Sequence, residues 1–110
     1  MSIQFKKGVL ELCILSMLSR NDHYGYDVAF KLSQSIDLAD GSVYPILRRL
    51  KQEGCVTSYL EEASGGPPRK YYAITAQGQA ALEELTEEWS LLVNRVNGII
   101  ENGGFDDEQN

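Results

Sequence analysis

The chain has 110 residues and a net charge of −6, with 43% hydrophobic and 24% charged residues. These values are typical of one soluble domain with a modest core, and no apolar run approaches the ~18 residues of a membrane span. The N-terminus lacks a secretory signal, so we expect a cytoplasmic protein with no membrane partner. Cys13 and Cys55 are too few and too widely spaced for a disulfide framework or a zinc site. We therefore expect free thiols, no metal and no cofactor.

The charge is distributed unevenly along the chain. Residues 1–75 hold nine Lys and Arg against eight Asp and Glu, whereas residues 76–110 hold one basic residue against eight acidic ones. The first part therefore carries +1 and the second −7. Any basic surface that attracts nucleic acid must lie in the first part.

The first two predicted elements are helices. Residues 5–19 should form the first helix, in which only Glu11 and Ser16 interrupt the apolar run from Val9 to Leu18. Such a helix should be buried on more than one side, with a second subunit covering one of them. Residues 20–23 are expected to form a polar turn that includes His23, the only histidine. A second helix follows Tyr24, and residues 33–39 should connect it to a third.

Residues 40–54 carry the strongest helix signals. Asp40 and Ser42 can cap the N-terminus, Pro45 is tolerated in the first turn, and Gly54 favours a left-handed C-terminal cap. A core-facing stripe recurs at three- and four-residue spacing: Val43, Ile46, Leu47 and Leu50. Five polar residues lie mostly off that stripe: Ser42, Tyr44, Arg48, Arg49 and Lys51. Such a helix, roughly 20 Å long, fits a DNA major groove about 12 Å wide, although a merely solvated surface helix would show the same pattern.

A basic β-hairpin is predicted next. Residues 55–62 alternate like a strand, residues 63–68 are a turn rich in glycine and proline, and residues 69–75 form the second strand. Arg69 and Lys70 stand at the edge of the turn. A hairpin placed directly after a helix–turn–helix is a wing.

Thr75 can cap a long final helix. Six apolar residues follow at alternating spacings of three and four: Leu82, Leu85, Trp89, Leu92, Val96 and Ile99. This spacing is that of a coiled-coil seam. A helix of about 25 residues, nearly 40 Å long, overhangs so small a domain, so we expect a two-fold dimer. Four seam residues should be buried between the subunits: Leu85, Trp89, Leu92 and Val96.

Several motifs together resemble the PadR family of bacterial transcriptional regulators over roughly residues 5–100. They are Tyr24-Gly25-Tyr26, the stretch 41–50 with Glu53-Gly54, the stretch 65–72, and residues 74–78. The resemblance implies a mainly α fold with a small β-hairpin. Residues 1–75 would be a winged helix–turn–helix, residues 76–102 a dimerisation helix, and residues 103–110 a disordered acidic tail.

The chain looks like the short branch of that family, some of whose dimers sense planar aromatic drugs between the subunits. Trp89 falls where a stacking tryptophan would be, and the resemblance places four further residues around the ligand: Phe5, Gly8, Leu12 and Val93. Val93 is apolar where an acidic residue would suit a cationic ligand, and Ala73 replaces a basic wing residue. Alternatively, Trp89 only fills the seam of the dimer.

The resulting hypothesis is a homodimeric repressor that binds a palindromic operator in double-stranded DNA and is released by a small hydrophobic or aromatic effector. The expected DNA contacts come from the start of the second helix, the third helix and the wing: Tyr24, Ser42, Tyr44, Arg48, Arg49, Lys51, Arg69 and Lys70. The alternative is a winged-helix module that binds proteins and not DNA. An enzyme is disfavoured because the sequence has no nucleophile beside a base and no phosphate loop.

Overall fold

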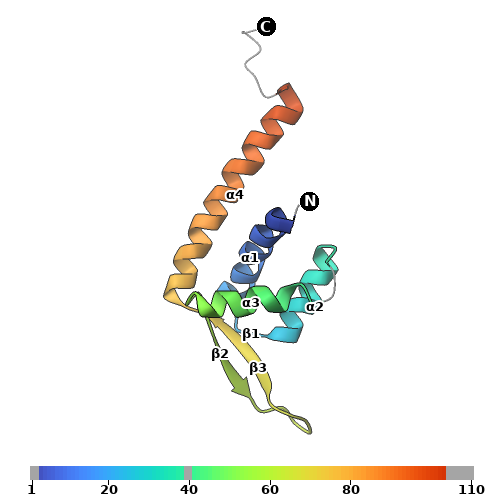
Figure 1. Ribbon diagram of the computed structural model, residues 1–110, viewed down its shortest axis with the longest axis vertical. Coiled ribbons are helices and arrows are strands. Elements are labelled where there is room, and N and C mark those ends of the chain that lie inside the picture. The colour runs from blue at the N-terminus through green and yellow to red at the C-terminus, as the bar shows by residue number, and fades with distance from the viewer. Residues whose placement is uncertain (1–2, 39–40, 104–110) are drawn as a thin grey trace.

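The computed structural model describes residues 3–38 and 41–103, which form a mainly helical fold with one small sheet (Figure 1). The elements in chain order are α1 (Ile3–Arg20), β1 (His23–Tyr24), α2 (Gly25–Ser35), α3 (Val43–Gln52), β2 (Val56–Glu61), β3 (Arg69–Ile74) and α4 (Ala76–Asn102). The predicted winged helix–turn–helix with a long C-terminal helix is confirmed. Within the described ranges, no helix combines the length and apolarity needed to cross a membrane. Asp40 and the predicted tail beyond Gly103 lie outside these ranges.

Helix α3 packs onto the core as its sequence predicts. All four stripe residues are buried, and Leu47 is fully inaccessible. Gly54 ends the helix with φ +80°, a left-handed conformation that glycine adopts without steric cost. Ser42 occupies the N-cap position with helical backbone angles, so the predicted side-chain cap is not formed there. The remaining core comes mainly from α1, α2 and the sheet: Leu10, Ile14, Leu15, Leu18, Val28, Leu32, Cys55, Val56 and Tyr72.

The sheet has three antiparallel strands in the order β1-β3-β2. Strands β2 and β3 pair from Val56 opposite Ile74 to Glu61 opposite Arg69, as expected for the wing. The predicted polar turn at residues 20–23 is shortened to Asn21 and Asp22, because Arg20 ends α1 and His23 pairs with Tyr72 as part of β1. That short strand joins the wing to the start of α2.

Hydrogen bonds fasten the start of α4 to the end of α3. The Thr75 Oγ1 accepts from the Gly78 amide at 3.0 Å, which confirms the predicted cap, and donates to the Gly54 carbonyl at 2.6 Å. The Gln77 side-chain amide donates to the Glu53 carbonyl at 2.8 Å. These hydrogen bonds connect the end of α3 to the start of α4, and we call this connection the joint between α3 and α4.

Close packing tightens this joint further. A Cβ atom at Gly78 would lie 2.1 Å from the Cys55 carbonyl oxygen and 2.7 Å from Cγ1 of Ile74. Only glycine allows α4 to approach the strand so closely. Cys55 and the half-buried Cys13 are free thiols, and burial raises the pKa of each.

Candidate nucleic-acid interface

Helix α3 presents polar and aromatic residues on the face opposite its core stripe. Tyr44 is 39% exposed, Arg48 and Lys51 are exposed, and Ser42 is half-buried at the start of the helix. Hydroxyl groups thus stand at the N-terminal end and cations further along. This arrangement allows hydrogen bonds to base edges near the start of the helix and attraction to phosphates along it.

Arg49 has a different environment from its neighbour Arg48. Its guanidinium forms an ion pair with Glu11 of α1, and both side chains are half-buried. The expectation that Arg49 shares the outer face with Arg48 and Lys51 is therefore corrected. Arg49 instead ties α3 to α1, because a one-residue step along a helix turns a side chain by about 100°.

The wing carries its cations at the start of β3. Arg69 and Lys70 are both exposed, and Glu61 is the cross-strand neighbour of Arg69. The Arg69 Cζ lies 5.2 Å from the centroid of the Tyr24 ring, a cation–π distance. Tyr24, a predicted DNA contact, is half-buried beneath this guanidinium.

Five aromatic rings follow one another from the wing to α2, and we call this row the aromatic strip: Tyr59, Tyr71, Tyr24, Tyr26 and Phe30. Successive ring centroids are 5.8, 6.0, 6.0 and 6.4 Å apart, within the range of favourable aromatic pairs. Tyr59 also donates a hydrogen bond of 2.7 Å to Oδ2 of Asp22, which raises the pKa of Tyr59 to about 12. This strip was not predicted from the sequence, although the cross-strand pair Tyr59–Tyr71 follows from the hairpin register.

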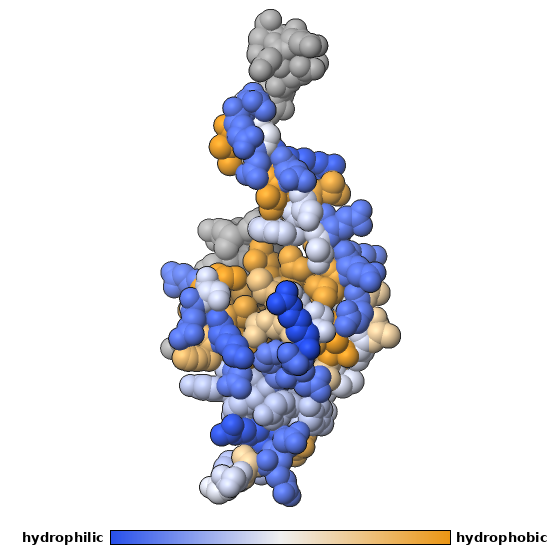
Figure 2. Space-filling view, turned by 180° about the vertical axis from the view of Figure 1, so that it is seen from behind, coloured by the Kyte–Doolittle hydropathy of each residue, from blue (hydrophilic) through white to orange (hydrophobic). Residues whose placement is uncertain are grey.

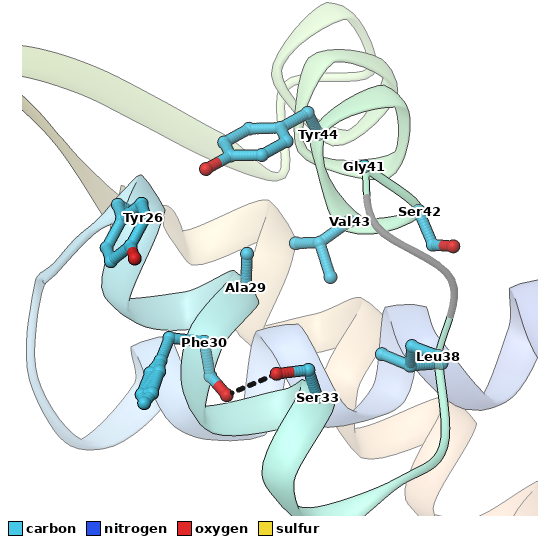
Figure 3. Close-up of a pocket in the computed structure, with 9 residues that line it drawn as sticks. All are labelled: Tyr26, Ala29, Phe30, Ser33, Leu38, Gly41, Ser42, Val43 and Tyr44. Carbon is cyan, nitrogen blue, oxygen red and sulfur yellow. Dashed lines mark hydrogen bonds between the residues drawn. The ribbon is translucent and has the colours of Figure 1, made fainter.

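A cavity of about 290 Å³ lies between α2 and the start of α3. Figure 3 shows Tyr44 reaching from α3 toward Tyr26 on α2, with Ala29 and Val43 beneath them. The Ser33 hydroxyl donates to the Phe30 carbonyl at 2.7 Å along one side. Tyr44 thus holds its ring at the surface between the two helices instead of in the core.

A second cavity, of about 240 Å³, lies between α1 and α4. We call it the α1–α4 groove, and its lining is mostly apolar: Gly8, Val9, Leu12, Leu85, Glu88, Trp89 and Leu92. Three of the five predicted effector residues therefore come together here, namely Gly8, Leu12 and Trp89. Val93 is half-buried but is not part of this lining, and the side chain of Phe5 lies outside the described residues.

Glu88 supplies an acidic group that would suit a cationic ligand and that the apolar Val93 does not provide. It is exposed and lines the groove beside Trp89, whose side chain is 40% exposed. The position of Glu88 in the sequence, directly before Trp89, could have indicated this acidic group, because both residues lie on the side of α4 that turns toward α1. The groove thus combines an indole ring, aliphatic walls and one carboxylate.

Helix α4 leaves the rest of the fold and keeps much of its seam uncovered. Leu82 and Leu85 pack against the core, whereas Leu92 and Val96 are each 41% exposed and Ile99 is 58% exposed. Figure 2 shows apolar surface scattered among hydrophilic residues along this projecting helix. The predicted interface residues therefore line up on a helix that its own domain covers only in part.

The fold and this surface define a winged helix–turn–helix DNA-binding protein. The family model described as the transcriptional regulator PadR-like family matches residues 14–84. The chain therefore belongs to the PadR-like family and is a DNA-binding transcriptional regulator, not an enzyme.

Individual relatives agree with this assignment. A PadR-like transcriptional regulator from Bacillus cereus is 39% identical, with a TM-score of 0.80 over 90% of this chain and 98% of that one. A protein from Streptococcus mutans is 33% identical, with a TM-score of 0.82 over 91% and 92%. The transcriptional regulator YqjI of Escherichia coli is 32% identical over 96 residues, which are 84% of this chain and 44% of that protein. The chain thus spans less than half of that relative.

Proposed function

We propose that the protein is a homodimeric repressor that binds a palindromic operator and is released when a planar aromatic molecule enters the α1–α4 groove. The observation that carries this proposal is the uncovered seam on α4. Leu92, Val96 and Ile99 expose apolar surface at coiled-coil spacing, and a second copy of the same helix is the simplest partner for such a seam. PadR regulators typically form dimers, which supports the same reading.

The proposed DNA contacts come from α3 and the wing. Ser42 and Tyr44 would reach base edges or nearby phosphates, because they stand at the start of the recognition helix. The phosphate contacts would come from the four exposed cations of these two elements: Arg48, Lys51, Arg69 and Lys70. Arg49 is left out of this set, because its guanidinium is already paired with Glu11.

The proposed effector site is the α1–α4 groove. Trp89 offers a face for stacking, Leu12 and Leu92 offer aliphatic contacts, and Glu88 offers a negative charge. This chemistry suits a flat, cationic aromatic molecule. Because α4 joins α3 rigidly, a ligand that changes the angle of α4 in the dimer also changes the spacing of the two recognition helices.

Selection of bound duplexes from a random pool tests the DNA-binding half of the proposal. We expect a palindrome whose half-sites are centred about 34 Å apart, one turn of DNA, because two-fold dimers present two recognition helices. Recovery of sequences without two-fold symmetry would contradict the dimeric reading. Recovery of no enriched sequence would favour the protein-interaction alternative.

Fluorescence tests the effector half. Trp89 is the only tryptophan, so a planar dye that stacks on it should quench the emission saturably at one dye per dimer. Bound dye should also weaken operator binding. Trp89→Ala, which has no indole emission, should fail to bind the dye when binding is followed by the dye's own fluorescence, and should remain dimeric. If that variant dissociates, or if no planar compound quenches, Trp89 serves only to pack the seam.

A further inference from the structure

We propose that the aromatic strip is a positioning device for the wing, in which Tyr24 holds the guanidinium of Arg69 and Tyr59 ties the hairpin to Asp22. The affinity that Arg69 contributes would then depend on residues that need not touch DNA. This inference rests on the proposed contact of Arg69 with phosphate, and it assigns a positioning role to Tyr24, which the sequence alone suggested as a direct contact.

The need for such a device follows from the place of Arg69 in the hairpin. It is the first residue of β3, directly after the turn rich in glycine and proline, and its side chain is exposed. An unconstrained arginine at such a site samples many rotamers, and DNA binding would have to select one of them. The Tyr24 ring, 5.2 Å from Cζ, restricts the guanidinium before DNA arrives.

The strip also joins four elements of the fold. Tyr59 and Tyr71 belong to the two wing strands, Tyr24 to β1, and Tyr26 to α2. The hydrogen bond from Tyr59 to Asp22, 37 residues away, adds a directional link at the wing end of the row. These ring contacts and this hydrogen bond restrain the hairpin relative to the helix–turn–helix. In the proposed device this restraint holds Arg69 in place relative to α3 before DNA binds.

Four variants of the full chain test the role of Tyr24, with a labelled duplex of random sequence as the probe. Arg69→Ala should make the negative slope of log K against log salt shallower by about 0.9, as expected for one lost phosphate contact. Tyr24→Leu should weaken binding about two- to five-fold, the range for an exposed cation–π contact. Tyr24→Phe keeps the ring and should bind like the wild type. The double variant Tyr24→Leu with Arg69→Ala should bind no more weakly than Arg69→Ala.

The outcomes separate this inference from the proposed function beneath it. If Tyr24→Phe binds as weakly as Tyr24→Leu, or if the two losses add in the double variant, Tyr24 contacts DNA by itself and the positioning role is wrong. If Arg69→Ala changes neither affinity nor salt slope, the proposed wing contact fails and the inference fails with it. A lowered melting temperature of Tyr24→Leu without a change in the DNA affinity of its folded fraction would mark a merely structural role and also overturn the inference.

Hydrogen exchange tests the link from Tyr59 to Asp22. Tyr59→Phe keeps the stacked ring and removes the hydroxyl, so backbone amides of β2 and β3 should exchange faster while the melting temperature of the domain stays unchanged. Thr57→Val removes a hydroxyl from an exposed position of the same strand and serves as the control. Equal exchange in the wild type and Tyr59→Phe would show that this hydrogen bond does not hold the wing.

Discussion

At the scale of single residues, Arg48 and Arg49 illustrate how two identical neighbours acquire different roles. Arg48 is exposed on the outer face of α3, and Arg49 is paired with Glu11 of α1. The chemistry of the two side chains is the same, so the direction of each Cα–Cβ bond on the helix decides whether it meets solvent or another helix.

This difference predicts opposite effects of one substitution. Arg48→Ala should make the negative slope of log K against log salt for DNA binding shallower by about 0.9, with no change in thermal stability. Arg49→Ala should instead destabilise the fold by about 0.2–1 kcal/mol, the range of measured ion pairs near the surface. Thermal unfolding and DNA titration of both variants provide the check. A loss of salt dependence in Arg49→Ala greater than that in Arg48→Ala would reverse the assignment.

Glu88 gives a second prediction at this scale. Glu88→Gln should weaken the binding of ethidium, a planar cation, by up to about five-fold, because an exposed carboxylate contributes modestly to pairing. It should leave phenanthridine, the uncharged parent ring, unaffected. Quenching of Trp89 measures both affinities. Glu83→Gln removes the same charge from the same helix outside the groove and should change neither, so an equal loss in both variants would point to the general charge of α4.

At the scale of elements, the joint between α3 and α4 depends on a missing side chain. Gly78→Ala should destabilise the protein by about 1–3 kcal/mol, because the added methyl meets the backbone oxygen of Cys55, which cannot move aside freely. Gly98 lies on the same helix, and a methyl group added there would have no neighbour within 4 Å, so Gly98→Ala should stabilise by up to about 1 kcal/mol. Urea unfolding of both variants measures the contrast. Similar effects of the two substitutions would mean that Gly78 matters only through helix propensity.

Elements whose signal is local were predictable from the sequence. The stripe of α3 repeats over two turns, Gly54 and Thr75 mark helix boundaries, and the seam of α4 extends over five intervals. Strand β1 was not predictable in the same way, because two residues have no periodicity. His23 and Tyr24 become a strand only through pairing with Tyr72 and Tyr71, which lie almost fifty positions further along.

The candidate site was predictable where its residues lie on one element. The exposed cations of the wing and the outer face of α3 follow from turn signals and helical spacing. The ion pair Arg49–Glu11 and the ring contact Tyr24–Tyr71 each join distant segments, so no local pattern contained them. Glu88 lay outside the prediction because the acidic residue was expected one turn after Trp89, whereas it stands directly before it.

At the scale of the whole molecule, the seam predicts that folding and association are linked. Leu92→Asp should convert much of the dimer to unfolded or dissociated chain at micromolar concentration, because the interface would bury an unpaired charge. Asn94→Asp adds the same side chain on the opposite side of α4 and should remain dimeric. Sedimentation distinguishes the two. A wild-type protein that sediments as a stable folded monomer at this concentration would refute the proposed dimer.

The projection of α4 away from the wing also separates charge along the long axis of the molecule (Figure 1). Five glutamates and a single arginine lie on α4, whereas the exposed cations of α3 and the wing lie toward the other end. The net negative charge therefore lies mainly on α4, and the field of a DNA duplex repels that end of the protein during approach. Removing glutamates from α4 should accordingly speed association at low salt and leave the lifetime of the complex unchanged, a difference that stopped-flow kinetics can resolve.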